Sequence, residues 1–154
     1  MCIGYNRRNM YAFDVSVEID APPERVWRAL CDPGEVVQWD TGVVQALDAP
    51  PNYPQEGQHV RWRYANGPFK LLHDRPIDVV PNRRLRSALA VGPVRFDETY
   101  TLDQRNGGCL LTAVMLVQVP VPLLGALVEK MSAGPAARSA VAASLAAIKR
   151  HCES

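Results

Sequence analysis

A meander of short strands joined by tight-turn signals is the feature of this sequence that most constrains its fold. Asn66-Gly67 and Asn106-Gly107 are strong two-residue hairpin signals, and residues 81–83 and Gly92-Pro93 mark two further reversals. Apolar and polar residues alternate between these turns, which is typical of strands with one buried face. From residue 58 onward the sequence therefore predicts neighbouring antiparallel strands in one sheet.

The turns also determine which side chains share a face of this sheet. If Asn66-Gly67 is a two-residue turn, Trp62 lies opposite Leu71 and Val60 lies opposite His73. Continuing through the later turns gives one inward face across five strands. This inward face is expected to contain both apolar and polar residues: Trp62, Tyr64, Leu71, His73, Arg75, Ile77, Ser87, Leu89, Phe96, Glu98, Tyr100 and Met115.

A strand and two short helices are predicted before the meander. Residues 13–20 alternate strictly between apolar and polar side chains, which predicts a half-buried strand. Residues 20–24 contain the prolines and acidic residues of a helix start. Residues 35–39 are expected to form a second short helical turn, and residues 43–47 another strand.

An amphipathic helix is predicted over residues 135–152 at the end of the chain. One arc of its helical wheel carries mainly small side chains: Ala137, Val141, Ser144, Leu145, Ile148 and Cys152. A helix with such a face either lies very close to its partner or leaves space unfilled. Gly134-Pro135 is expected to break a longer terminal helix at this point.

Composition and charge exclude several classes of function. The formal net charge of +1 over 154 residues gives no electrostatic basis for binding nucleic acid or an anionic membrane. The four cysteines have no CxxC spacing, so we expect no metal, no cofactor and reduced thiols in a cytoplasmic protein. The most apolar run, residues 119–128, is too short to span a membrane. We expect a loose leader over residues 1–12 and a single domain over residues 13–154.

The sequence resembles START-like proteins of the SRPBCC superfamily, in the polyketide cyclase/dehydrase and lipid-transport branch. Residues 19–30 and Trp39 carry the resemblance, together with residues 81–85, residues 98–100 and the alanine-rich terminal helix. The resemblance implies an α+β helix-grip fold, in which a curved antiparallel sheet of about six to seven strands wraps around the C-terminal helix. It also implies an apolar ligand between sheet and helix, but no catalytic residue common to the family.

Four polar residues of the predicted inward face are candidates for chemistry. Glu98 needs a partner or water, because burying an unpaired carboxylate is costly. Ser87 is its cross-strand neighbour, and Arg75 two strands away is within reach of an extended side chain. These residues either orient a ligand's carbonyl or hydroxyl, or form a structural ion pair, or face outward through a slipped register. His73 is either a general acid/base or a packed, hydrogen-bonded histidine.

Two sets of residues are expected to line a cavity for a hydrophobic or aromatic ligand, or else to fill the core. They are Trp39, Trp62, Tyr64, Leu71, His73, Arg75, Ser87, Phe96, Glu98, Tyr100 and Met115 from the sheet side, and Val141 and Leu145 from the helix.

The sequence leaves three functions open. The first is binding or transport of a hydrophobic small molecule, lipid-like or polyketide-like. The second is a polyketide cyclase, aromatase or dehydratase that uses Glu98, Arg75, His73 and Tyr100. The third is a protein-interaction domain with a basic outer strip, and a homodimer is also left open.

Overall fold

The computed structural model describes residues 10–119 and 133–154, and its elements follow the predicted order. Strand β1 (Met10–Ile19) is followed by helices α1 (Pro23–Cys31) and α2 (Pro33–Trp39). The remaining elements are β2 (Val43–Ala46), β3 (Val60–Tyr64), β4 (Leu71–Val80), β5 (Arg84–Val91), β6 (Val94–Arg105), β7 (Gly108–Gln118) and α4 (Ala133–Glu153).

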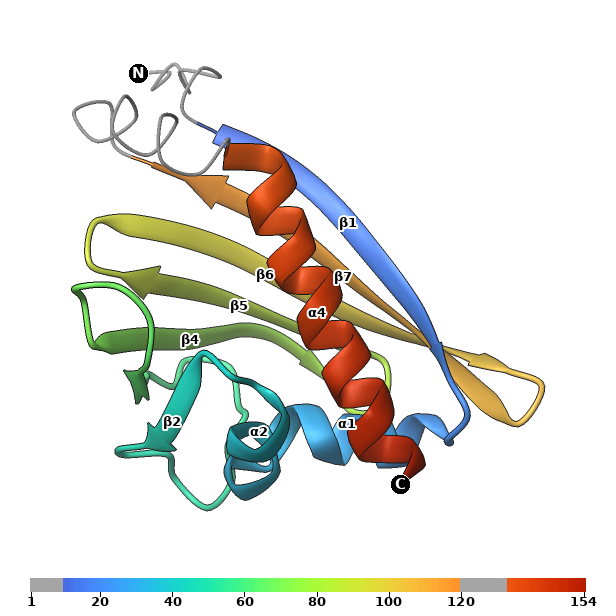
Figure 1. The fold of residues 1–154 in the computed structure, drawn as a ribbon. Coiled ribbons are helices and arrows are strands. Elements are labelled where there is room, and N and C mark those ends of the chain that lie inside the picture. The colour runs from blue at the N-terminus through green and yellow to red at the C-terminus, as the bar shows by residue number, and fades with distance from the viewer. Residues whose placement is uncertain (1–9, 120–132) are drawn as a thin grey trace, which may run out of the picture.

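The strands of the described part form one antiparallel, seven-stranded sheet in the order β1-β7-β6-β5-β4-β3-β2. Figure 1 shows this sheet curving around α4, which crosses its concave side obliquely. Helix α4 packs mainly against β1, and its C-terminal end meets α1 and α2. The molecule therefore has the expected α+β helix-grip fold.

Polar side chains fix the positions of the three helices relative to one another. Asp32 accepts a hydrogen bond from the Gly34 amide at 2.8 Å, so it caps α2 directly after α1 ends. Glu35 on α2 accepts a hydrogen bond from Arg25 Nη1 of α1 at 2.7 Å. The same carboxylate lies 2.8 Å from Nε2 of His151 on α4. This contact network holds the end of α4 against both short helices.

The predicted register of β5, β6 and β7 is confirmed. Glu98 pairs with Ser87 on one side and with Met115 on the other. Asn106 and Gly107 have φ values of 38° and 86°, the positive values that a two-residue hairpin turn requires. Side chains at alternate positions of these three strands therefore point to the concave face as expected.

The prediction of a two-residue turn at Asn66-Gly67 is wrong. Strand β3 ends at Tyr64 and β4 begins at Leu71, so Trp62 pairs with Leu72 instead of Leu71. The longer connection allows Phe69 to cover the β5–β6 turn. A Cβ added to Gly92 would lie 2.5 Å from Phe69 Cγ.

This one-residue difference reverses the two faces of the first half of β4. Leu72 and Asp74 point to the concave side, whereas Leu71, His73 and Arg75 point to the outer side.

A β-bulge in β4 restores the predicted phase beyond Pro76. Val79 pairs with Leu85 as expected, but Ser87 pairs with Pro76 rather than with Ile77. Proline has no amide hydrogen for the ladder, and within sheets it is accommodated at edges and bulges. Ile77 is the extra residue and is 45% exposed. The bulge explains why the predicted register is wrong for the first half of β4 and correct for its second half.

The terminal helix is confirmed, with the predicted face turned inward. Leu145, Ile148 and Cys152 are buried, and Val141 is half-buried. Gly134 and Pro135 lie in the first turn of α4, where a proline is tolerated. The chain before Ala133, to which the prediction of a broken longer helix refers, lies outside the described residues.

At the other terminus, β1 begins at Met10, which is earlier than the predicted start at residue 13. Of the leader predicted over residues 1–12, residues 10–12 belong to β1, and residues 1–9 lie outside the described residues.

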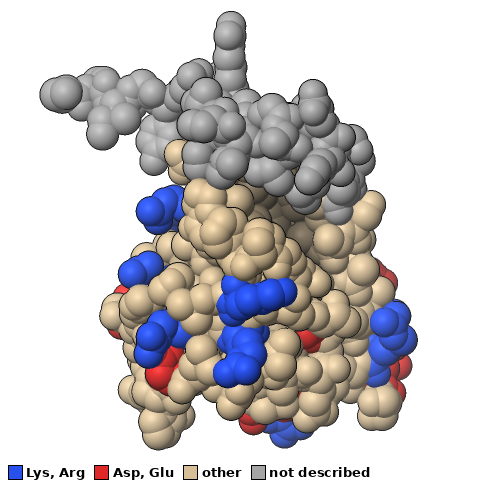
Figure 2. Space-filling view, turned by 60° about the vertical axis from the view of Figure 1, so that its left-hand side comes forward, with Lys and Arg blue, Asp and Glu red and all other residues tan. Residues whose placement is uncertain are grey.

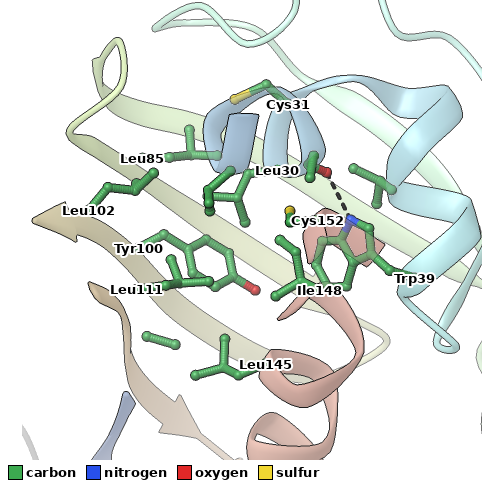
Figure 3. Close-up of a cluster of buried hydrophobic side chains, with 14 of the residues drawn as sticks. Leu30, Cys31, Trp39, Leu85, Tyr100, Leu102, Leu111, Leu145, Ile148 and Cys152 are labelled. Carbon is green, nitrogen blue, oxygen red and sulfur yellow. Dashed lines mark hydrogen bonds between the residues drawn. The ribbon is translucent and has the colours of Figure 1, made fainter. Parts of the chain in front are cut away.

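The hydrophobic core is densest where α4 meets α1, α2 and the nearby ends of β6 and β7. Leu30, Leu111, Leu145 and Ile148 converge there in Figure 3, and each is at most 4% exposed. Trp39 closes this end of the core, with its Nε1 donating a hydrogen bond to the Ala29 carbonyl at 2.8 Å.

Candidate functional site

The concave face of the sheet is closed at one end and partly accessible at the other. Leu85 and Tyr100, which pair near the short helices, are buried. Leu89 and Phe96 pair farther along the same two strands, and both retain accessible surface although their strands are central in the sheet. On α4, Leu145 is 1% exposed, whereas Val141 one turn earlier is only half-buried. We call this partly accessible stretch of the concave face the hollow.

Glu98 lies at the boundary between the closed end and this hollow. It points to the concave face between Ser87 and Met115, and it keeps some accessible surface there. Burial raises the pKa of Glu98 from an ordinary 4.5 to about 8, and the negative charges of Asp40 and Asp74 add to this effect. The Tyr100 hydroxyl, in hydrogen-bonding reach, partly opposes the shift.

Asp74 is a second buried carboxyl on the concave face. Its Oδ2 accepts hydrogen bonds from the Tyr53 hydroxyl at 2.7 Å and from Trp62 Nε1 at 3.1 Å. Ser87 is close enough to act on the same carboxyl. Burial nevertheless raises the pKa of Asp74, because desolvation destabilises the charged form by more than these hydrogen bonds stabilise it. Within the described part of the chain, Oδ1 has no hydrogen-bond partner.

Asp40 is a third carboxyl near Glu98, and it comes from the end of α2. It caps the helix–strand connection by accepting a hydrogen bond from the Gly42 amide at 2.9 Å. Burial raises the pKa of Asp40, and its charge in turn contributes to the raised pKa of Glu98. The charges of Asp40 and Asp74 therefore both act on Glu98.

Sequence reasoning found Glu98 but missed Asp40, Asp74 and Tyr53 as members of this site. Asp74 was placed outside by the wrong register of β4. Tyr53 lies in the proline-rich connection between β2 and β3, where no periodic pattern shows which way a side chain points. The signal that could have corrected Asp74 was Pro76, because a proline inside a strand pattern indicates a bulge.

His73 and Arg75 lie on the outer face, so the structure agrees with the slipped register among the three alternatives and contradicts an Arg75–Glu98 cluster. Arg75 is exposed on the outer face. His73 lies on the same face, with its Nδ1 2.8 Å from His59 Nε2. Partial burial and the nearby positive charges of His59 and Arg75 lower the pKa of His73. The slipped register of β4 is the physical reason for both corrections.

The other predicted lining residues divide between the core, the hollow and the outer face. Trp39, Tyr100 and Leu145 fill the closed core. Phe96 is partly accessible in the hollow, and Met115 is buried beside Glu98. Trp62 belongs to the core, and Val141 packs against the edge of that core. Leu71 instead borders a separate groove on the outer side of the sheet, and Tyr64 at the end of β3 also lines this groove.

Cysteine and metal chemistry have little basis in the described residues. Cys31, Cys109 and Cys152 are buried free thiols. Burial raises the pKa of Cys109 to about 11 and raises the pKa of Cys31 further, so neither is a nucleophilic thiolate at neutral pH. Residues 10–119 and 133–154 contain no cluster of three metal-ligating side chains. Nor do they contain a helix with the length and hydrophobicity needed to cross a membrane.

A curved antiparallel sheet around a C-terminal helix, with a hollow between them, defines a START-like protein of the SRPBCC type. The family model described as polyketide cyclase / dehydrase and lipid transport matches residues 10–153, and the chain belongs to this family. The predicted family is thus confirmed. Membership supports hydrophobic ligand binding or a polyketide cyclase role in general terms. No curated protein matches the sequence.

Solved structures support the same fold. Protein CV1439 from Chromobacterium violaceum has a TM-score of 0.74 at 22% identity, with 93% of this chain and 97% of that chain covered. DynU16, from the dynemicin biosynthetic locus, has a TM-score of 0.65 at 25% identity, and the match covers 93% of this chain but 47% of DynU16. Norcoclaurine synthase from Thalictrum flavum has a TM-score of 0.65 at 14% identity, with 92% of both chains covered.

Proposed function

We propose that this protein binds a hydrophobic small molecule, lipid-like or polyketide-like, between the concave face of the sheet and α4. The observation that carries this proposal is the partly accessible surface of Glu98, which points inward from a central strand of the sheet. Apolar side chains such as Phe96, Met115 and Val141 border the same space. Ligand sites of this kind combine apolar walls with a few polar groups that orient the bound molecule. Glu98 is the group best placed to contact a polar atom of the ligand.

Native mass spectrometry of freshly purified protein tests whether a small molecule is retained. A thermal-shift screen with acyl chains and polycyclic aromatics extends the test. A ligand present at one hundred times its Kd should add about 2.7 kcal/mol to the free energy of unfolding. In a domain of this size that corresponds to a rise in Tm of about 5–10 °C. No retained molecule and no shift across the screen would contradict the proposal.

A pair of tryptophan substitutions locates the bound molecule. Leu89 points into the hollow, so Leu89→Trp should fill part of it and weaken binding about tenfold or more. Val114, 43% exposed on the opposite face of β7, supplies the matched control, and Val114→Trp should leave the Kd unchanged. Equal effects of the two substitutions would place the ligand elsewhere.

A cyclase- or dehydratase-type enzyme is the second candidate, and the protonation of Glu98 favours it. With a pKa of about 8, this carboxyl keeps its proton at neutral pH and can donate it to a bound carbonyl or leaving group. Tyr100 is the other candidate that remains beside it, since His73 and Arg75 lie outside. Once a substrate is found, Glu98→Gln should abolish turnover but preserve substrate binding. Full activity in this variant would exclude Glu98 from the mechanism.

A further inference from the structure

The outer face of the sheet carries a groove that is separate from the interior hollow. It has a volume of about 490 Å³ and is open to solvent. It lies across β2, β3 and the start of β4, and its lining consists of Val44, Leu47, Arg63, Tyr64, Lys70 and Leu71. Arg63 and Leu71 pair on the side of the sheet opposite to Trp62 and Asp74. The sheet itself therefore separates the groove from the hollow.

A β-bulge in β2 shapes one wall of this groove. The register shifts between Val43 and Gln45, so Val44 is the extra residue and points to the outer side. Val44 is 53% exposed, and Leu47 just beyond the strand is 42% exposed. Leu71 at the start of β4 supplies the opposite apolar wall. Apolar side chains therefore flank Arg63, the central residue of the lining, on both neighbouring strands.

The charge of the groove is entirely positive. Arg84 and Arg86, also exposed on the outer face, form ion pairs with Asp78 and Asp97. Arg63, in contrast, has no acidic partner in the described part of the chain, and the Nζ of Lys70 donates to the Ala65 carbonyl at 3.1 Å. Figure 2, which brings the left-hand side of Figure 1 forward, shows lysine and arginine side chains more prominently than acidic ones. The groove thus offers uncompensated cations beside apolar walls.

We propose that this outer groove binds a small anionic amphiphile, a molecule with an apolar chain or ring that ends in a carboxylate. The apolar part packs against Val44, Leu47 and Leu71, and the carboxylate accepts charge-assisted hydrogen bonds from Arg63 and Lys70. The volume falls within the range of about 300–1,000 Å³ for small-molecule sites. A site on this face goes beyond the proposed interior function and does not depend on it.

Two other occupants fit the groove less well. A bilayer surface contacts side chains that protrude from a protein, whereas these residues line a concave groove. A second copy of the chain, related by a two-fold axis, would bring Arg63 and Lys70 of both copies close together. Like charges at such short distances repel, and the groove has no acidic lining residue to offset them.

The proposal is tested by titrating the protein with decanoate and with decan-1-ol, both below the concentration at which decanoate forms micelles. Backbone amide shifts in NMR spectra report the site and the Kd. Decanoate should shift the amides of Val44, Arg63 and Leu71. Two exposed charge contacts are together worth about tenfold in Kd, so decan-1-ol should bind about tenfold more weakly. Raising the salt concentration should weaken only decanoate.

Variants with equal changes in net charge make the test specific. Arg63→Gln combined with Lys70→Gln should weaken decanoate binding about tenfold and leave decan-1-ol unchanged. Arg84→Gln combined with Arg86→Gln removes two other outer-face cations and should change neither Kd. Circular dichroism melting checks that both variants fold.

Four results would overturn the proposal. They are equal affinity for both probes, equal weakening by the two double variants, decanoate-induced shifts at Phe96 and Met115 instead of the groove, and binding that occurs only with anionic vesicles. Self-association through this face, seen by sedimentation, would assign the groove to a second copy and would likewise overturn it. Shifts at Phe96 and Met115 would at the same time support a ligand in the hollow, whereas the other results do not bear on such a ligand.

Discussion

At the scale of single residues, Glu98 connects the fold to its chemistry. It occupies an inward position on a central strand, so its carboxyl leaves water without gaining a cation among the described residues. Protonation avoids the cost of a buried charge. In the proposed function, the same proton makes Glu98 a hydrogen-bond donor to the bound molecule. Under that proposal, stability and ligand contact depend on the same titration.

Glu98 should make the protein less stable as pH rises. Its pKa is about 8 in the folded state and about 4.5 when the chain is unfolded, so between these values the folded state binds more protons. The free energy of unfolding then falls with pH and the loss is complete above the folded-state pKa. Glu98→Gln should flatten this slope and stabilise the protein at pH 8 by an amount on the order of a few kcal/mol. Urea denaturation between pH 5 and pH 9 measures the effect.

Asp14→Asn is a suitable control for this experiment, because Asp14 is exposed on the outer side of β1. A part of the slope should remain in Glu98→Gln, since burial raises the pKa of Asp40 and Asp74 in the same direction. An unchanged slope in Glu98→Gln would contradict the assignment of a raised pKa to Glu98.

Tyr53 should contribute to stability through its bond to Asp74. Tyr53→Phe removes a donor to a buried carboxyl and leaves that carboxyl with fewer partners. Such a loss costs about 1.5–3 kcal/mol. Tyr64→Phe is the matched control, because no hydrogen bond from the Tyr64 hydroxyl is found among the described residues. Denaturant titration compares the two variants, and equal stability would mean that the 2.7 Å contact contributes nothing in solution.

At the scale of elements, α4 divides into a packed half and a half that borders the hollow. Its C-terminal half is fixed by the core around Leu145 and Ile148 and by the contact between His151 and Glu35. Its preceding turn, at Val141, lies over partly accessible inward residues. Small side chains on this helix therefore do not serve close packing along its whole length.

Alanine substitutions along α4 should reveal this division. Leu145→Ala leaves a cavity in a filled core and should cost about 3 kcal/mol of stability. Val141→Ala borders existing space and should cost less than about 1 kcal/mol. Both values come from urea denaturation. Comparable losses at the two positions would show that the sheet and α4 are packed throughout and that no hollow separates them.

Strand β4 shows how one element can serve two faces. Its first half places Asp74 inside and His73 outside, and the bulge beyond Pro76 lets Val79 pair in the register that the next turn demands. A strand without the bulge could pair correctly with only one of its two neighbouring strands in these registers. The bulge thus makes the buried carboxyl at Asp74 compatible with the rest of the sheet.

At the scale of the whole molecule, stability should be concentrated at the closed end. Leu102 and Leu111 pair across β6 and β7 in the densest part of the core. Phe96 and Val117 pair on the same two strands beside the hollow. Backbone amides near the first pair should exchange with solvent only by global unfolding, and those near the second pair at least about tenfold faster. Hydrogen exchange followed by NMR measures both rates.

Ligand binding in the hollow should reduce the difference in amide exchange rate between the two ends of β6 and β7. A ligand packed against Phe96 lowers the population of local openings there, so the faster amides should become more protected. The amides near Leu111 serve as the internal reference. Uniform exchange along β6 in the ligand-free protein would contradict a hollow at one end.

The sequence alone determined the elements of this protein and most of their order in the sheet. Period-two and period-3.6 patterns are local, and so are the turn at Asn106-Gly107 and the cap at Asp32. These signals were enough to place Glu98 between Ser87 and Met115, because each strand pair there is joined by a short turn. The family resemblance rested on the same local features.

Only the tertiary structure determined which face of the sheet each side chain of β4 occupies, and therefore which residues belong to the candidate site. The β3–β4 connection is longer than its Asn-Gly pair predicts, and within it Phe69 lies over Gly92 on another hairpin. That contact joins segments that are distant in sequence, and no local pattern encodes it. The longer connection places Asp74 inside and leaves Arg75 outside. A one-residue shift thus removed Arg75 from the face of Glu98 and brought Asp74 to that face.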